Sequence, residues 1–577
     1  MGRRGRKKAS PPPSARSESP KKRSRGESAD VVAASPPPAK RLKDGQCINS
    51  RSLKLTADEN YGGPSSSIYV DEVGTVYDAT LNQTNASANN NKFYVIQLLV
   101  HDSTQTYRAY TRWGRVGEIG QAKVLGDGSL ESAKHEFEKK FRDKSGLRWD
   151  QRQDPPKPKK YTFLQKMYEE ESNTEDDIDG IPGASKRRES ATSLNRSEPT
   201  ESKLPSPVQR LMNLIFNKDY FASAMSAMNY DTNKLPLGKL SKKTLKDGYT
   251  VLKELAELVR DPTIATSRNM SYHQLVEQLS NRYLSLIPHV IPRGSRPPII
   301  NTDEAVKREV ETLENLTDMR LADQIIKDAG SGTDEEGLSQ LDRQFRSLNL
   351  REMTPLASES REFTQIEEYL RKTAAQAHLI NYDVEDIFRI ERSAEQDRFE
   401  KSVFADFASQ GRSDRRLLWH GSPCTNFGGI LSQGLRIAPP EAPVSGYMFS
   451  RGVYLASMST KSANYCRSFQ TGNIGLLLLC EAELGNPMLK LYDADYEADE
   501  KAKAYGFVST WGVGRTTPKA WKDASVVNEQ LKGVQMPDTS ELPGEIEDDR
   551  CALAYDEYIC YDISQIRLRY LLRVRIS

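Results

Sequence analysis

Two polar stretches divide this chain and rule out a single continuous globule. Residues 1–45 contain thirteen Lys and Arg against four Asp and Glu, together with two runs of three prolines. Residues 169–199 change from acidic side chains to Ser, Thr, Pro and basic residues without apolar periodicity. Such segments bury too little apolar surface to offset the entropy of folding. The sequence therefore predicts a disordered basic tail over residues 1–60 and a flexible linker over residues 169–202.

The rest of the chain has the composition of several folded domains in a reducing compartment. A length of 577 residues exceeds the roughly 100–200 residues of an ordinary domain. The longest apolar runs, such as 476–480, are far shorter than the roughly 20 residues of a membrane span, and the N-terminus lacks an apolar signal core. The six cysteines show no zinc-site spacing. We expect no membrane association, no disulfides and no structural metal.

Two basic clusters in the tail suggest where the protein works. They are KKRSR at 21–25 and KRLK at 40–43. Clusters of this kind serve as nuclear-import signals or as nonspecific contacts to DNA. The alternative is a charged tail that is merely solvated.

Three regions with distinct periodicities follow. Residues 65–168 combine strand-like runs at 76–81 and 93–100 with a helix carrying apolar residues from Leu130 to Phe141, so we expect an α+β unit with order beginning near Tyr69. Residues 203–335 show apolar positions at helical spacing, which predicts a helical bundle. Residues 352–577 mix helices and strands as in an α/β domain, and the last strand alternates apolar and basic residues, indicating one apolar face.

Short motifs near the C-terminus carry polar side chains that suit a ligand. In the His-Gly-Ser sequence at 420–422, the glycine lets an amide group pair with its backbone. Ser462 and Tyr465 are three residues apart on a predicted helix and so share one face. Glu557 interrupts an apolar strand, where a carboxylate is costly to bury, and Asp556 points to the opposite face. Each motif alone is also compatible with a structural role.

Taken together and in order, longer motifs resemble the catalytic domain of the poly(ADP-ribose) polymerase family. They are LLWHGS at 417–422, GLRIAPP at 434–440, GVY at 452–454, KSANYC at 461–466 and DEY at 556–558. The resemblance implies an ADP-ribosyltransferase fold, NAD as the ADP-ribose donor, and a catalytic triad of His420, Tyr454 and Glu557. It implies no metal, because nicotinamide leaves as a neutral heterocycle.

The resemblance also implies how the donor binds. Gly421 and Ser462 would bond the nicotinamide carboxamide, Tyr454 and Tyr465 would sandwich its ring, and His420 would hold the adenosine ribose. The other positions implied for the donor site line its adenosine side or cover it: Ser422, Asn426, Gly429, Arg436 and Tyr447.

The implied chemistry resembles the cleavage of a glycoside. Breaking the bond between ribose and nicotinamide develops oxocarbenium-like charge on the ribose. Glu557 is expected to bond the ribose 2′-hydroxyl and to orient or activate the incoming hydroxyl. The intact triad favours synthesis of a polymer over transfer of single units.

The two upstream regions resemble the other modules of the smaller family members, which lack zinc fingers. The Trp-Gly-Arg string at 113–115 resembles the WGR domain, which contacts DNA breaks in the family; Trp113 would stack on a sugar or base, and Lys92, Arg112 and Arg115 would pair with phosphates. The strings KLP at 203–205 and PLGKLS at 236–241 resemble the regulatory helical domain, which restrains NAD access. A passive spacer is the alternative for that bundle.

The sequence thus predicts a multidomain protein with an α+β WGR domain, an all-α regulatory bundle, an α/β ADP-ribosyltransferase-fold catalytic domain and a disordered basic N-terminal tail. The predicted function is nuclear, DNA-break-activated poly(ADP-ribosyl)ation of proteins, including the chain itself, with nicked or broken DNA as partner and the growing polymer as a further acceptor. Two alternatives stay open. One is a mono-ADP-ribosyltransferase or NAD hydrolase on the same fold, and the other is a non-catalytic scaffold at DNA ends.

Overall fold

The computed structural model describes residues 46–48, 54–168, 201–331, 338–375 and 380–577. Residues from Gly45 to Ser577 form one unit of mutually contacting elements. The basic clusters at 21–25 and 40–43 and nearly all of the predicted linker lie outside the described residues. Among the helices that are described, none combines the length and the apolar character that crossing a membrane would require.

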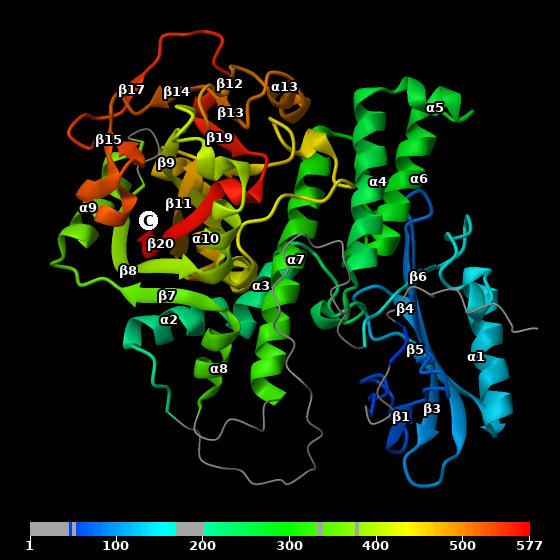
Figure 1. The fold of residues 1–577 in the computed structure, drawn as a ribbon. Helices are drawn as coiled ribbons and strands as arrows, with labels where there is room; N and C mark the ends of the chain where they lie inside the picture. Colours follow the sequence, from blue (N-terminus) through cyan, green and yellow to red (C-terminus); the bar gives the residue numbers. More distant parts are fainter. Residues whose placement is uncertain (1–45, 49–53, 169–200, 332–337, 376–379) are drawn as a thin grey trace, which may run out of the picture. The chain divides into compact units, whose positions relative to one another are not determined.

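An antiparallel sheet with one helix on its face forms the first domain (blue and cyan in Figure 1). Its strands run in the order β5-β4-β3-β2-β6, and β1 pairs with β3. Helix α1 packs on the sheet through Ala133, Phe137 and Phe141, all fully buried, as their helical spacing predicts. The α+β expectation is confirmed. The elements are β1 (Ser66–Ile68), β2 (Asp78–Asn85), β3 (Asn90–His101), β4 (Tyr107–Arg115), β5 (Gln121–Gly128), α1 (Leu130–Ser145) and β6 (Thr162–Leu164).

Packed structure begins well before Tyr69, contrary to the expectation from sequence. Ile48 is buried against the sheet face opposite α1, in a cluster that includes Tyr110. Asp58 forms an ion pair of 2.7 Å with Arg112 on the same face. These residues lack any apolar periodicity of their own, because they cover the sheet as an irregular segment and not as a helix or strand.

The predicted helical bundle is confirmed and has the long helix α7 at its centre (Figure 1). Helix α6 begins at a capping box between Ser271 and Gln274 and ends just before Pro288, as proline requires. Helices α4 and α6 pack together and α4 packs against α7, burying leucines such as Leu252 and Leu313. The helices are α2 (Ser206–Ile215), α3 (Lys218–Ala227), α4 (Lys242–Arg260), α5 (Thr263–Ser267), α6 (Tyr272–Leu286), α7 (Asp303–Ser331) and α8 (Gln340–Ser347).

The C-terminal domain is built on two principal sheets. One has the order β15-β16-β9-β11-β20-β8-β7, and the other has the order β10-β19-β13-β12. The strands of the first are β7 (Leu350–Pro355), β8 (Tyr382–Arg392), β9 (Arg415–Ser422), β11 (Ile474–Glu483), β15 (Trp521–Asp523), β16 (Gln535–Pro537) and β20 (Ile566–Ile576). Those of the second are β10 (Val453–Leu455), β12 (Leu489–Leu491), β13 (Ser509–Gly512) and β19 (Glu557–Cys560).

The last strand, β20, differs from the sequence prediction in having both faces covered. It lies between β11 and β8. Of the basic side chains that alternate with its apolar residues, Arg567 is buried, Arg569 and Arg573 are half-buried and Arg575 is exposed. Arg567 and Arg569 both pair with Glu481 of β11, a carboxylate that is only 1% exposed. Alternation of charge therefore marks ion pairing inside the sheet here, and not a solvent-facing edge.

Candidate active site

Three strands bring the predicted triad to one cleft. His420 lies near the end of β9, Tyr454 in β10 and Glu557 at the start of β19. Strand β10 pairs antiparallel with β19, and a bridge between Trp419 and Ala456 ties the β10 segment to β9. All three side chains line a cleft of about 2230 Å³. The structure thus gathers residues that are up to 137 positions apart in the sequence (557 − 420).

Hydrogen bonds to the backbone fix the first two members of the triad. The His420 Nδ1 atom lies 3.0 Å from the Tyr454 carbonyl oxygen. The Tyr454 hydroxyl donates to the Ser450 carbonyl over 2.7 Å and accepts from the Phe449 amide over 2.9 Å. Burial lowers the pKa of His420 and raises the pKa of Tyr454, so both side chains are neutral at pH 7. Neutral groups in fixed positions suit the binding of ribose hydroxyls.

Glu557 is buried but has a cationic partner. Its carboxylate lies 2.6 Å from the Lys461 Nζ atom, which sits at the edge of the same cleft. Burial acts to lower the pKa of Lys461, but the attraction of Glu557 outweighs it and raises that pKa, so the ammonium stays charged. Lys461 belongs to a motif quoted from the sequence, yet no sequence pattern pairs it with Glu557.

Asp556 points away from the cleft, as the period of the strand predicts. It is fully buried on the other face, where it accepts hydrogen bonds from the Gly514 amide over 2.9 Å and from the Thr517 hydroxyl. Burial raises the pKa of this carboxyl group. Of the two neighbouring carboxylates, therefore, Glu557 faces the cleft and Asp556 anchors the strand.

Close packing explains the glycine at position 421. A Cβ atom on Gly421 would lie 1.9 Å from the Ser462 carbonyl oxygen, because helix α12 (Ser459–Ala463) crosses directly over β9. The predicted nicotinamide-site residues Gly421, Ser462 and Tyr465 thereby meet at the cleft, with Ser462 buried and Tyr465 46% exposed.

We expect Gly421→Ala to reduce NAD turnover by at least about 100-fold, because the contacting Ser462 carbonyl belongs to backbone that cannot yield as a flexible side chain would. Turnover is measured with labelled NAD at saturating DNA. Gly62→Ala is the matched control, since a Cβ atom there meets nothing within 4 Å. Equal turnover in the two variants would contradict the close approach of α12 to β9.

The positions implied for lining the adenosine side of the donor, or for covering it, mostly line the same cleft. Ser422, Asn426, Arg436 and Tyr447 all contribute to its wall. Gly429 does not line it: this residue lies in α11 (Phe427–Gln433), and a Cβ atom on it would lie 2.8 Å from Asp318 of α7. Its small size serves the packing of α7 on the catalytic domain.

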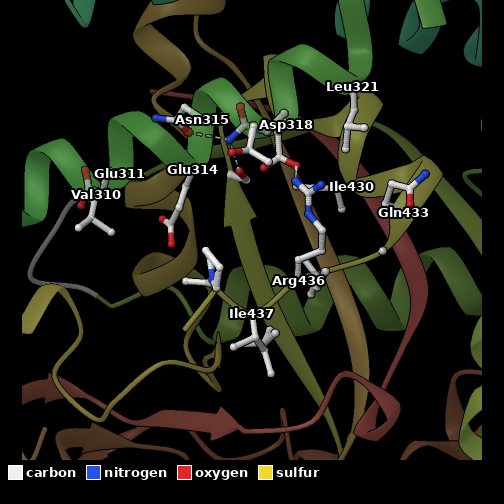
Figure 2. Close-up of a pocket in the computed structure, with 18 of the residues that line it drawn as sticks. Val310, Glu311, Glu314, Asn315, Asp318, Leu321, Ile430, Gln433, Arg436 and Ile437 are labelled. Carbon is white, nitrogen blue, oxygen red and sulfur yellow. Dashed lines mark hydrogen bonds and ion pairs between the residues drawn. The ribbon is translucent and has the colours of Figure 1, made fainter. Parts of the chain in front are cut away.

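Helix α7 engages polar side chains at positions that are predicted to line or cover the donor site (Figure 2). The Asn426 amide donates to Asn315 over 2.7 Å, Arg436 forms an ion pair with Asp318, and the Tyr447 hydroxyl donates to Glu314. A further ion pair of 2.7 Å joins Arg467 to Glu311. We call Glu314, Asn315 and Asp318 with their three partners the α7 clasp. Sequence reasoning did not find these α7 residues.

The predicted DNA-contacting residues have different environments. Lys92 is exposed, and Trp113 stacks on Tyr94 at 5.8 Å and remains partly exposed. Arg115 reaches carbonyl oxygens in a neighbouring loop and in the helical bundle. Arg112 is buried, with 3% of its side chain exposed, and is engaged by Asp58 and by the Ile119 carbonyl. In this structure Arg112 anchors the N-terminal segment through Asp58, and its contact with DNA stays a prediction.

Comparison with known proteins finds matches along most of the chain. The families matched are the poly(ADP-ribose) polymerase catalytic domain over residues 360–576, the poly(ADP-ribose) polymerase regulatory domain over 202–345 and the WGR domain over 77–156. The chain is 40% identical over 507 residues to poly(ADP-ribose) polymerase 2 of Arabidopsis thaliana, covering 87% of this chain and 73% of that one. It is 37% identical over 514 residues to poly(ADP-ribose) polymerase 2 of Homo sapiens, covering 88% and 80% respectively.

Proposed function

This chain belongs to the poly(ADP-ribose) polymerase family, and on that premise we propose that it is a nuclear enzyme that builds poly(ADP-ribose) on proteins, including itself, when it meets broken DNA. Its catalytic domain is that of an NAD-dependent ADP-ribosyltransferase. The observation that carries the proposal is the buried Glu557 carboxylate, held beside Lys461 in the cleft that His420 and Tyr454 also line. The basic clusters at 21–25 and 40–43 favour the nucleus.

The triad has groups suited to each part of the reaction. His420 and Tyr454 supply neutral hydrogen-bonding groups for the hydroxyls of the donor. As the bond between ribose C1′ and nicotinamide breaks, its electron pair leaves with nicotinamide and positive charge develops on the ribose. The Glu557 carboxylate stabilises that charge and orients the incoming hydroxyl, whose oxygen bonds to C1′. The hydroxyl proton passes to Glu557 or through it to water.

Activation by DNA requires a link between the WGR domain and the cleft, and direct contacts between the first domain and the bundle support one. The Asn91 amide, beside Lys92, donates to the His289 carbonyl over 2.8 Å. The His289 ring lies 3.3 Å from Glu309 of α7, five residues before Glu314, the first residue of the α7 clasp. A change in the loop that carries Lys92 therefore has a short path to α7.

The contacts of the α7 clasp support the hypothesis that the helical bundle restrains the access of NAD to the cleft. It engages Asn426 and Arg436, expected to receive the adenosine side of the donor, and Tyr447, expected to cover it. Donor and α7 therefore compete for the same side chains. We infer that broken DNA favours an arrangement in which α7 releases them, which is a two-state coupling.

Because the carboxyl groups of the clasp are buried, we expect the restraint of α7 on NAD access to weaken as pH rises. Burial raises the pKa of Glu314 to about 7 and that of Asp318 to about 6, with Arg436 opposing the shift, while Glu311, Tyr249 and Tyr447 also face the pair. When α7 is released, both return toward an ordinary pKa of about 4. The clasp is thus most stable below about pH 4 and loses that protonation-linked stability as pH rises to about 7.

We accordingly expect the ratio of DNA-free to DNA-saturated turnover to rise about tenfold from pH 6 to pH 8. The ratio cancels the pH dependence of the chemical step itself. In Glu314→Gln, which keeps a hydrogen-bond acceptor but cannot titrate, most of the rise should disappear. A rise of the same size in this variant would show that other groups set the pH dependence.

Incorporation of labelled NAD by the full chain tests the proposed function. The assay compares reactions without DNA, with an intact duplex and with a nicked 5′-phosphorylated duplex. Long protein-linked polymer that appears with the nicked duplex is the expected result. Single protein-linked units would establish a mono-transferase, free ADP-ribose alone a hydrolase, and no NAD consumption a scaffold. Polymer formed equally without DNA would remove the break-sensing role.

A further inference from the structure

A tight turn beside the triad has an unfavourable backbone conformation. We call residues 448–451 the cleft turn. Its third residue, Ser450, has a φ of +60°, in the left-handed region that residues with a side chain rarely adopt. Ser450 is fully buried, and its hydroxyl oxygen has no hydrogen-bond partner among the described residues. Backbone strain and an unpaired buried hydroxyl both cost free energy, so the surroundings of the turn must impose this conformation.

The imposed conformation directs the backbone of the cleft turn at Tyr454. The Ser450 carbonyl accepts a hydrogen bond from the Tyr454 hydroxyl over 2.7 Å, and the Phe449 amide donates to the same hydroxyl over 2.9 Å. The Tyr454 ring stacks on the ring of Tyr447, with the ring centres 6.1 Å apart and an angle of 24° between the planes. A shift of the turn would therefore move both tyrosine side chains.

Two further contacts anchor the cleft turn to the strands around Glu557. Tyr561, the residue after β19, donates its hydroxyl to the Phe449 carbonyl over 3.0 Å. The Tyr561 hydroxyl also lies 2.6 Å from the Thr510 hydroxyl, and burial raises its pKa, so it stays protonated and able to donate. The Phe449 ring packs on Gly512 of β13, where a Cβ atom would lie 2.5 Å from the ring. Since Gly512 pairs directly with Glu557, the turn takes its position from the strand that carries this carboxylate.

A turn that merely connects two segments would be the ordinary explanation of a positive φ. Such turns lie at the surface, where water satisfies their polar groups. The cleft turn is buried instead, and its polar backbone groups are used by two tyrosine hydroxyls, those of Tyr454 and Tyr561. Both tyrosines line the cleft, as does Met448 of the turn, whereas Ser450 is fully buried behind them. Ser450 thus acts on a ligand through Tyr454 and not by touching it.

We propose that Ser450 and Tyr561 are positioning residues for the donor, because together they lock the cleft turn that holds Tyr454 and Tyr447 in place. The inference rests on the proposed function, under which these two tyrosines contact and cover bound NAD. It concerns the binding geometry of the donor and not the chemical step. Loosening the turn should therefore weaken donor binding more than it slows turnover at saturating NAD.

Donor binding to the full chain tests the positioning role without catalysis. The probe is an NAD analogue in which carbon replaces the ring oxygen of the nicotinamide ribose, so that the bond to nicotinamide does not break. Its Kd is measured by calorimetry at saturating nicked duplex. In Tyr561→Phe, which removes only the hydroxyl, the Kd should rise at least about fivefold. With NAD itself, the KM of this variant should rise by a similar factor while kcat stays within about twofold.

Tyr369→Phe is the matched control for the loss of a buried tyrosine hydroxyl. Tyr369 is fully buried in the same domain, and its hydroxyl donates to the Leu417 carbonyl over 2.9 Å. This substitution should lower the unfolding temperature about as much as Tyr561→Phe does, since each removes one buried hydrogen bond. The Kd for the analogue should stay unchanged in Tyr369→Phe, so a general loss of stability is distinguished from a displaced turn.

Two substitutions of Ser450 separate the backbone conformation from the side chain. Ser450→Gly keeps a positive φ at no steric cost, so its Kd for the analogue should stay within about twofold. Ser450→Val adds a β-branched side chain that disfavours this conformation, and its Kd should rise at least about tenfold. Should the valine variant show no cooperative unfolding transition, the result for Tyr561→Phe decides alone.

An unchanged Kd in Tyr561→Phe would overturn the proposal, as would a Ser450→Gly variant that binds the analogue as weakly as Ser450→Val. A lowered kcat at an unchanged KM in Tyr561→Phe would overturn it too, because the turn would then serve the chemical step and not the binding of the donor. If the unmodified chain binds the analogue but turns over no NAD, and the variants weaken binding as expected, the positioning role stands while the proposed function is removed.

Discussion

Replacing Glu557 by Gln is expected to end polymer growth while leaving the donor site intact. The substitution keeps the size of the side chain and one oxygen acceptor, but removes the negative charge that lies 2.6 Å from Lys461. Loss of a preorganised electrostatic group at a developing charge reduces turnover by about 10²–10³-fold. Because the acceptor hydroxyl also needs this carboxylate, chain extension should suffer more than the transfer of a first unit.

The measurement is the length distribution of protein-linked product from labelled NAD at saturating nicked DNA. Glu557→Gln should yield single units or none, with the Kd for NAD changed by less than about threefold, as expected for a group that acts mainly in the transition state. Asp556→Asn is the matched control, because it changes a neighbouring carboxylate that faces away from the cleft. Polymer of ordinary length from Glu557→Gln would exclude the assigned role.

The site residues that could be predicted from the sequence are those that lie within short local motifs. His420, Gly421, Ser462 and Glu557 each sit in a short string with its own local geometry, and the structure places all of them on one cleft. The pairing of β10 with β19, which brings Tyr454 near Glu557, is long-range and was not predicted; only the resemblance to a family grouped these two residues.

The features that sequence missed arise from contacts between separate domains. Asn315 and Asp318 appear in the sequence as ordinary polar residues of an amphipathic helix, and only the packing of α7 on the catalytic domain gives them partners. Arg112 is a second case. A phosphate contact is predicted for it, and in the structure it forms an ion pair with Asp58, a residue in the stretch predicted to be disordered. Helical periodicity cannot reveal either contact, because it reports burial and not the identity of the partner.

Disrupting the α7 clasp is expected to give the largest gain in DNA-free turnover. In Glu314→Ala/Asp318→Ala, the hydrogen bond from Tyr447 and the ion pair with Arg436 are both lost. At pH 6, where Glu314 is still mostly protonated, these two contacts together stabilise the restrained arrangement by about 2–4 kcal/mol, which is about 30- to several-hundred-fold in its population. DNA-free turnover should therefore rise by at least about tenfold, and the stimulation by nicked DNA should shrink by a similar factor.

Two comparisons separate loss of restraint from damage to the bundle. Asp328→Ala removes an exposed carboxylate from the same helix without touching the clasp, so its DNA-free turnover should match that of the unmodified chain. With saturating DNA, turnover of the double variant should stay within about twofold, because α7 has then already released the donor site. If the restraint were a general property of the helical fold, both variants would raise DNA-free turnover in proportion to their loss of stability. A rise confined to the clasp variant, at a lowered KM for NAD, means that α7 and the donor compete for Arg436 and Tyr447.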